Sequence, residues 1–279
     1  MRGSRLLFSL ALGLALLAGC ASLEQKQGQW IFQPSDSSWG DSAQAAQGMQ
    51  EVWISFDSRL TGRPAKLHAL WLASSTGADA APVLLYLHGA RWNVTGSAPR
   101  IRRMQELGFS VLALDYRGFG KSDATTPSEA LALEDAHAAW DWLAQHHPAQ
   151  RRFIFGHSLG GAIAIELASH VADESGTIVE GTFTSIPDVV GSMKWGWLPV
   201  GLLITQRFDA LRRVASIGSP LLVVHGSQDR LIDPELGRRL YAAALDPKRF
   251  VLVEGGSHHN TNALGQAQYR AALAELFKL

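Results

Sequence analysis

From residue 52 onward the sequence alternates short apolar runs with longer stretches of helical character, and this alternation constrains the fold most. Strands are expected at residues 52–56, 67–72, 83–87, 110–114, 153–155, 178–183, 221–224 and 250–253. Helices are expected at residues 100–107, 128–147, 159–171 and 263–279, and after Pro234. Strands alternating with helices predict an α/β fold: a mostly parallel central sheet with helices on both faces. The first two strands are expected to form an antiparallel pair.

Composition and charge limit the classes of protein to which the chain can belong. Its 279 residues are 47% hydrophobic and 18% charged, which suits one large globular domain; we place this domain at residues 51–279. The 25 basic and 25 acidic residues give a formal net charge of zero, so nucleic acid is not expected as a partner.

The first residues have the pattern of a secretion signal. Arg2 and Arg5 precede an apolar run at residues 6–18, which is short for a bilayer span and typical of a signal-peptide core. The run leads into Leu17-Ala18-Gly19-Cys20, which resembles the lipobox of bacterial lipoproteins. This resemblance implies a signal peptide at residues 1–19 and acylation of Cys20, the only cysteine. An ordinary signal peptide with an incidental cysteine is the alternative.

A lipidated Cys20 would anchor the protein to a membrane of the cell envelope, since several acyl chains hold a protein stably. Ala21 follows the cysteine, and by family analogy this favours the outer membrane, with the protein on its periplasmic side. Residues 20–50 are rich in Gln, Ser, Ala and Gly, a composition typical of a flexible tether. Trp30, Ile31, Phe32 and Trp39 interrupt this stretch, so part of it is expected to pack on the domain.

A strand, a glycine-flanked serine and a helix follow one another directly in the second half of the chain. Gly156-His157-Ser158-Leu159-Gly160-Gly161 contains a G-x-S-x-G pattern between the strand at 153–155 and the apolar stretch at 159–171. This context is typical of a nucleophile elbow, a strained turn that exposes the serine hydroxyl. The flanking glycines avoid collisions in the turn, and the helix N-terminus favours negative charge on an oxyanion. We predict that Ser158 is a nucleophile.

A serine hydroxyl needs a base to take its proton, and the base needs an acid to orient it. His225-Gly226-Ser227-Gln228-Asp229 follows the strand at 221–224, and Gly255-Gly256-Ser257-His258-His259 follows the strand at 250–253. An acid and a base therefore follow the serine in the chain order used by this kind of fold. Asp233 remains an alternative acid and His259 an alternative base.

Five segments together resemble the α/β-hydrolase superfamily, in particular its small-lidded esterases, depalmitoylases and serine-aminopeptidase-like members. They are Leu87-His88-Gly89, Asp115-Tyr116-Arg117-Gly118-Phe119-Gly120-Lys121-Ser122, Gly156–Gly161, His225–Asp229 and Gly255–His258. The resemblance covers roughly residues 50–279. It implies a triad of Ser158, Asp229 and His258, with the backbone amides of Ala90 and Leu159 as oxyanion donors. No HExxH motif or paired-cysteine spacing is present, and neither a metal nor another cofactor is expected.

The expected reaction is acyl transfer to Ser158 followed by hydrolysis, with esters favoured over thioesters and amides as substrates. A lid is expected at about residues 184–219, where Met193, Trp195 and Trp197 belong to a largely apolar stretch. This stretch either forms an acyl-binding wall or a lipid-contacting surface, or is an ordinary amphipathic helix packed on the sheet. The expected partner is a small or lipid-like acyl substrate. An amidase or aminopeptidase, favoured by an acidic residue near the site, and a non-catalytic envelope lipoprotein remain alternatives.

Overall fold

The computed structural model describes residues 23–35, 42–75, 77, 80–193, 201 and 203–279. The signal peptide, Cys20 and Trp39 lie outside these ranges. So do Trp195 and Trp197 of the expected lid.

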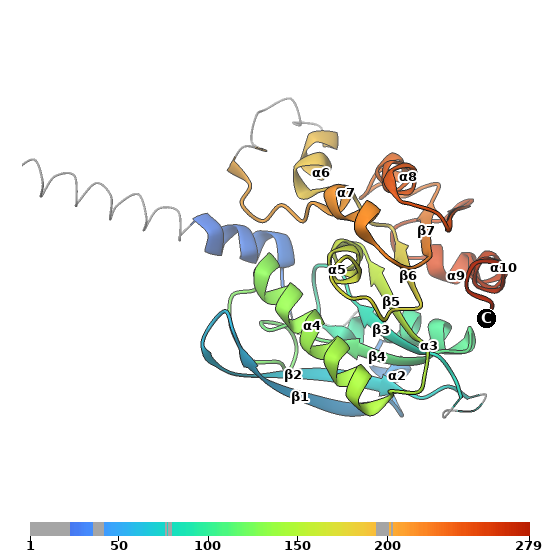
Figure 1. Cartoon of the computed structure of the whole chain (residues 1–279). Coiled ribbons are helices and arrows are strands. Elements are labelled where there is room, and N and C mark those ends of the chain that lie inside the picture. Colours follow the sequence, from blue (N-terminus) through green and yellow to red (C-terminus); the bar gives the residue numbers. More distant parts are fainter. Residues whose placement is uncertain (1–22, 36–41, 76, 78–79, 194–200, 202) are drawn as a thin grey trace, which may run out of the picture.

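One eight-stranded sheet forms the centre of the molecule, in the order β1-β2-β4-β3-β5-β6-β7-β8 (Figure 1). The strands are β1 Gln50–Ser58, β2 Arg63–Leu72, β3 Val83–Leu87, β4 Ser110–Leu114, β5 Arg152–His157, β6 Gly176–Glu180, β7 Leu221–Gly226 and β8 Lys248–Val253. Strands β1 and β2 pair antiparallel, as does β2 with β4, and all other neighbours are parallel. This arrangement confirms the predicted α/β-hydrolase fold, including the antiparallel opening pair.

Helices cover both faces of the sheet (Figure 1). They are α2 Ser42–Ala45, α3 Ala98–Glu106, α4 Glu129–His146, α5 Leu159–Ala168, α6 Ile186–Ser192, α7 Ala210–Arg213, α8 Pro234–Ala243, α9 Thr261–Leu264 and α10 Gln266–Phe277. Apolar side chains of α4, α5 and α8 pack in one core, and those of α3 and α10 pack in the other. The strands between them are buried on both faces; β3, β4 and β6 are buried at every residue.

The prediction of one continuous helix over residues 263–279 is wrong. Helix α9 ends at Leu264 and α10 begins at Gln266, so Gly265 separates them. A Cβ at Gly265 would lie 2.8 Å from Cγ2 of Val253 and 3.0 Å from the carbonyl oxygen of Thr261. The chain therefore bends where only glycine fits against β8. None of the helices among the described residues is long and apolar enough to cross a membrane.

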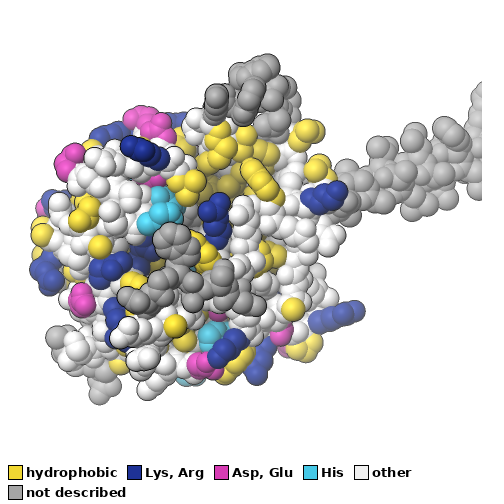
Figure 2. All heavy atoms as spheres, turned by 180° about the vertical axis from the view of Figure 1, so that it is seen from behind, with side chains coloured by type: hydrophobic (Ala, Val, Ile, Leu, Met, Phe, Trp, Pro, Cys, Tyr) yellow, Lys and Arg dark blue, Asp and Glu magenta, His cyan; other side chains and the backbone are white. Residues whose placement is uncertain are grey.

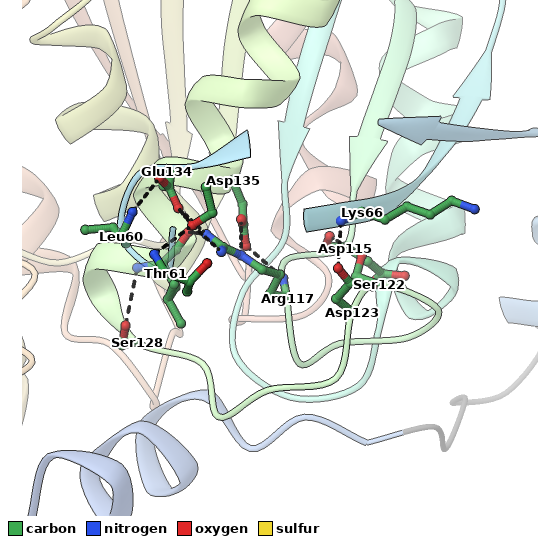
Figure 3. A network of polar contacts seen from close by, with 12 residues as sticks. Leu60, Thr61, Lys66, Asp115, Arg117, Ser122, Asp123, Ser128, Glu134 and Asp135 are labelled. Atoms are coloured by element: carbon green, nitrogen blue, oxygen red, sulfur yellow. Dashed lines mark hydrogen bonds and ion pairs between the residues drawn. The ribbon is translucent and has the colours of Figure 1, made fainter. Parts of the chain in front are cut away.

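A buried polar network fixes the loop between β4 and α4, which carries the motif from Asp115 to Ser122 (Figure 3). Arg117 donates hydrogen bonds to Asp135 at 2.6 Å and to Glu134 at 2.6 Å, and Asp123 accepts one from the backbone N–H of Lys66 at 2.7 Å. Arg117 and Asp135 are almost fully buried. The network thus joins the motif to α4 and β2 and gives it a structural role.

Candidate active site

Ser158 occupies a sharp turn between β5 and α5. Its backbone has φ 56° and ψ −121°, a conformation that a non-glycine residue adopts only when its surroundings hold it there. The Ser158 N–H donates to the carbonyl oxygen of Glu180 at 2.9 Å, and the Ser158 carbonyl accepts from the hydroxyl of Thr182 at 2.8 Å. These partners lie at the end of the neighbouring strand β6 and just after it. The turn therefore has the strained geometry that the glycine-flanked motif predicts.

Two glycines make this turn possible. A Cβ on Gly156 would lie 2.1 Å from the carbonyl oxygen of Gly160. A Cβ on Gly160 would lie 2.1 Å from the carbonyl oxygen of Leu87, at the end of β3. Any side chain at either position would push the serine turn away from the strand ends.

His258 and Asp229 form a buried pair at the ends of β8 and β7. The His258 Nδ1 lies 2.8 Å from Oδ2 of Asp229, so the N–H on Nδ1 donates to the carboxylate. The side chains of both residues are more than nine-tenths buried. This tautomer leaves Nε2 of His258 as the nitrogen that can accept a proton.

The surroundings of Asp229 stabilise its charged form. Its Oδ1 accepts hydrogen bonds from the backbone N–H groups of Leu231 and Ile232, each at 2.9 Å. Burial opposes ionisation, but hydrogen bonds from His225 and His258 outweigh it and hold the pKa of Asp229 below its usual range. A carboxylate that stays ionised can orient the His258 ring and stabilise positive charge on it.

The structure distinguishes the predicted acid and base, Asp229 and His258, from the alternative acid and the alternative base. Asp233 is exposed, and its Oδ1 caps helix α8 by accepting from the N–H of Glu235 at 2.9 Å. His259 is exposed and its ring lies 6.4 Å from that of Trp92, in the loop after β3. Asp229 therefore pairs with His258 and not with His259.

The loop after β3 packs directly against Ser158. A Cβ on Gly89 would lie 3.0 Å from Cβ of Ser158, so the backbone here comes very close to the serine. Ala90 follows in this loop, and Leu159 is the first residue of α5, where amide N–H groups have no partner within the helix. The two residues predicted to supply the oxyanion donors thus lie near Ser158, Leu159 as the next residue and Ala90 after Gly89.

Ser158, His258, Ala90 and Leu159 all lie on the wall of one cavity of about 650 Å³. Within the described part of the structure, no hydrogen bond joins Ser158 Oγ to His258. In enzymes without substrate, catalytic hydrogen bonds are often long and tighten only when substrate is bound. Apolar residues line much of this wall: Trp30, Ile31, Phe183, Ile186, Val189, Val190, Met193, Leu231 and Ile232. Figure 2 shows this hollow as a gathering of yellow side chains with dark blue ones beside it.

Helix α6 belongs to the expected lid and serves two purposes. Ile186 and Val189 are 8% exposed and pack against the core, while Val190 and Met193 join them in lining the cavity. Helix α6 is thus both packed on the body of the protein and part of the cavity wall.

The charged groups of the cavity wall are positive. Arg91, Arg100 and Arg103 line it, and no Asp or Glu is found among the lining residues that the structure describes. Arg91 donates to Gln33 and Arg103 to Asn262, which are neutral partners. Arg100 is ion-paired, with its Nε 2.9 Å from Oε1 of Glu180, and Glu180 and Glu106 also lie close enough to interact with the charge of Arg103. The Asp, Glu, Lys and Arg side chains that line the described part of the cavity are therefore all arginines.

Behind the site, the sequence analysis missed a buried cluster that supports it. Glu180 is fully buried at the end of β6 and contacts both Arg100 and the hydroxyl of Tyr269. His157 is buried beside it, with Nε2 3.0 Å from the carbonyl oxygen of His258. Burial first, and the charge of Arg100 second, lower the pKa of His157 well below its usual value. The signal available for Glu180 was an acidic residue within the predicted strand at residues 178–183, which contains no other charged residue.

No metal site is evident within the described ranges, where no group of three or more His, Cys, Asp or Glu side chains is placed to hold an ion. The chemistry available to the cavity is that of a serine, an imidazole paired with a carboxylate, and backbone amides. This set can carry out nucleophilic acyl transfer.

Comparison with known proteins places the chain among relatives of the same architecture. Residues 78–198 match the family model described as serine aminopeptidase, S33. An uncharacterised Mycobacterium tuberculosis protein is 34% identical over 70% of this chain and 69% of its own length. The α/β hydrolase domain-containing protein WAV2 of Arabidopsis thaliana is 30% identical over 79% of this chain and 75% of its own length. The Pyrococcus furiosus esterase Pf2001 has a similar structure, with a TM-score of 0.67 and 21% identity over 88% of this chain and 97% of that one.

Proposed function

Because the chain belongs to the α/β-hydrolase superfamily, we propose that it is a serine hydrolase that cleaves carboxylic esters through an acyl-enzyme intermediate. One observation carries this proposal: a serine held in a strained turn shares a cavity with a histidine that is hydrogen-bonded to a buried carboxylate. In this proposal Ser158 is the nucleophile, His258 the base and Asp229 the residue that orients it.

The reaction proceeds in two steps. Ser158 Oγ attacks the ester carbonyl carbon while Nε2 of His258 takes the hydroxyl proton, and the amides of Ala90 and Leu159 stabilise the oxyanion. The tetrahedral intermediate collapses, and the alcohol leaves with the proton held by His258. Water then attacks the acyl-enzyme with His258 again as base, which releases the carboxylic acid and restores Ser158.

The cavity supports an acyl ester rather than an amine substrate. Apolar side chains of α6 and of residues 30–31 can receive an acyl chain, whose burial is favourable by about 0.8 kcal/mol per CH₂ group. An aminopeptidase needs a negative group to hold the free amine of its substrate, whereas the charged groups on the described wall are arginines. The amidase or aminopeptidase alternative is therefore the weaker candidate.

Hydrolysis of 4-nitrophenyl esters with acyl chains of graded length tests the proposed activity. We expect turnover by the wild type, with kcat/KM rising as the chain lengthens. Ser158→Ala and His258→Ala should each lower kcat by about 10⁴-fold or more. His259→Ala serves as the matched control and should retain kcat within about threefold, since Asp229 is hydrogen-bonded to the ring of His258 and not to that of His259 in the described structure. Ester hydrolysis that survives Ser158→Ala would contradict the proposal.

A panel of leaving groups distinguishes the ester from the amine alternative. Matched substrates that share one acyl chain carry a neutral, a negative or a positive group on the alcohol, and amino-acid 4-nitroanilides form the second set. We expect the positively charged esters to have the highest KM, and this penalty to shrink in the Arg91→Gln/Arg103→Gln variant. Faster cleavage of the nitroanilides than of any ester would favour the aminopeptidase and overturn the ester assignment.

We also propose that the protein is a lipoprotein of the cell envelope, held through Cys20 in the outer membrane with its domain in the periplasm. The support is the sequence of residues 1–20, where a charged start and an apolar run precede the only cysteine. Expression in a bacterium fed radiolabelled palmitate should label the wild type and not Cys20→Ser. Equal labelling of both would reject Cys20 as the acylated residue.

A further inference from the structure

The segment of residues 23–35, here called the N-terminal strap, lies against the loop that follows β3. Residues 23–32 of the strap are helical, and its last three residues run alongside the loop. The Arg91 N–H donates to the carbonyl oxygen of Phe32 at 2.7 Å. Pro34 forms a parallel bridge with Trp92, and the Ser35 N–H donates to the Trp92 carbonyl at 3.4 Å. The strap thus forms a short parallel pairing with the residues directly after Ala90.

This pairing holds the loop after β3 in a backbone conformation that is unfavourable for residues with side chains. Arg91 has φ 72° and Trp92 has φ 57°, so two consecutive residues with side chains lie in the left-handed region. Side chains disfavour this region because Cβ comes too close to the following carbonyl oxygen, and glycine is free of the penalty. A loop with two such residues keeps its shape only if contacts outside the loop hold it. The strap supplies backbone contacts to both residues.

The strap is itself firmly attached to the body of the protein. Phe32 is 0% exposed, and its ring makes edge contacts with the rings of Phe119 at 6.0 Å and Phe208 at 5.7 Å. A Cβ on Gly28 would lie 2.3 Å from the carbonyl oxygen of Pro127, so the strap helix lies very close to the chain before α4. Gln27 accepts from the Thr205 N–H at 2.8 Å, which joins the strap to the segment after α6.

The strap also reaches the cavity. Trp30, Ile31 and Gln33 line the same wall as Ser158 and His258. The Arg91 side chain crosses to the strap, with its Nε donating to Oε1 of Gln33 at 3.1 Å. One stretch of thirteen residues, 23–35, therefore contacts the loop beside the serine, the segment after α6 and the cavity itself.

We infer that the N-terminal strap is a positioning element of the active site: it holds Arg91 and Trp92 in the left-handed conformation and thereby holds the Ala90 amide where the oxyanion forms. Phe32 is the positioning residue, because its side chain fixes the strap and its carbonyl oxygen binds the Arg91 N–H. This role rests on the proposed function, since it requires an oxyanion to form beside Ala90.

Three full-length variants test this role: Phe32→Ala, Arg91→Gly and the double variant. We expect Phe32→Ala to lower kcat for 4-nitrophenyl acetate by about tenfold or more, with KM changed by less than about threefold, because an oxyanion donor acts on the transition state. Adding Arg91→Gly to Phe32→Ala should recover kcat by about threefold or more, since glycine adopts the left-handed conformation without the strap. The acetate ester is used because its short acyl group does not depend on the cavity wall at Ile31, which the neighbouring substitution Phe32→Ala also disturbs.

Phe277→Ala is the matched control, because Phe277 is also buried but packs in the other core, against Phe153. It should lower the melting temperature while the folded protein keeps its kcat. If Phe32→Ala does not fold, Phe32→Leu replaces it, with a smaller loss of kcat and the same recovery by Arg91→Gly. A folded Phe32→Ala that keeps kcat within twofold, or a loss that Arg91→Gly does not reduce, overturns the role. Absence of esterase activity in the wild type would instead reject the proposed function.

Discussion

At the scale of single residues, the site depends on glycines at positions where a Cβ would collide with neighbouring backbone. Ser158 has a positive φ, at a cost of about 1–3 kcal/mol that the surrounding structure must offset. Gly156 and Gly160 allow the turn to lie against the end of β3, and Gly89 allows the next loop to reach Ser158. The position of Ser158 on the cavity wall is therefore a product of close backbone packing around it.

Gly160→Ala should destabilise the protein and disturb the turn, because the new methyl group would lie 2.1 Å from the carbonyl oxygen of Leu87. We expect a loss of about 2–3 kcal/mol in the free energy of unfolding, measured by urea denaturation, together with a fall in kcat. Gly218→Ala is the control, because a Cβ there meets nothing within 4 Å. Equal stability of the two variants would show that the turn tolerates a side chain.

Asp229→Asn and Asp233→Asn separate the two candidate acids. Asparagine at position 229 keeps the size of the side chain but removes the charge and allows the wrong tautomer of His258, so we expect kcat to fall by about 10³–10⁴-fold. Asparagine at position 233 can still cap α8, so Asp233→Asn should keep activity and stability close to the wild type. Ester hydrolysis at saturating substrate measures both. The reverse order of effects would assign the orienting role to Asp233.

At the scale of helices and strands, the site is held by contacts between segments far apart in the sequence. Helix α3 carries Arg100, whose Nε donates to Glu180 at the end of β6, 80 residues further along the chain. Both side chains are buried, and Glu180 also contacts Tyr269 of α10. The same residue, Glu180, accepts the Ser158 N–H through its backbone. The buried cluster thus joins α3, β6 and α10 behind the nucleophile turn.

Glu180→Gln should be strongly destabilising, since it leaves the buried Arg100 charge without the negative charge that compensates it. We expect a loss of about 3–5 kcal/mol in the free energy of unfolding. The more accessible pair of Arg212 and Asp209, at 3.8 Å, provides the comparison, and Asp209→Asn should cost less than about 1 kcal/mol. Urea denaturation at pH 7 measures both. A cost below about 1 kcal/mol for Glu180→Gln would mean that the buried pair contributes little.

The sequence predicted the strands and the order of the candidate site residues well, because both depend on local patterns. The apolar run at residues 83–87 became β3 and the predicted strand at 110–114 became β4; the predicted helix from residue 128 became α4, capped by the Ser128 hydroxyl, which accepts from the Leu131 N–H. The pairing of Arg100 with Glu180 depends on topology, which local patterns do not contain. Residues 31 and 32 pack on the domain, as their apolar side chains predicted, but only the folded domain defines the pocket that buries Phe32. Gly265 similarly breaks a helical pattern because of packing against β8.

At the scale of the whole molecule, burial of histidines makes stability depend on pH. Burial lowers the pKa of His157 well below its usual value and also lowers the pKa of His88, where the charge of Asp115 opposes it. Below about pH 6.5 the unfolded chain binds protons at these side chains, while the folded protein keeps them neutral. Since the unfolded state then binds more protons, the free energy of unfolding falls as the pH falls.

We therefore expect stability to decrease from pH 7 to pH 5, by at most about 1.4 kcal/mol per pH unit for each such histidine. His157→Gln should reduce this slope, whereas His170→Gln, at an exposed position, should leave it as in the wild type. Urea denaturation at several pH values between 5 and 7 measures the slope. A constant free energy of unfolding over this range would contradict the neutral state of the buried histidines.

The central claim is that Ser158 is activated by His258 within this cavity. Labelling of the full-length protein in detergent with a fluorophosphonate probe tests it most directly, followed by identification of the modified residue by mass spectrometry. We predict rapid modification of Ser158 alone, slowed by about 10³-fold or more in His258→Ala and absent in Ser158→Ala. A folded wild type that does not react, or reacts at another serine, would contradict the account and favour a non-catalytic envelope lipoprotein built on the same fold.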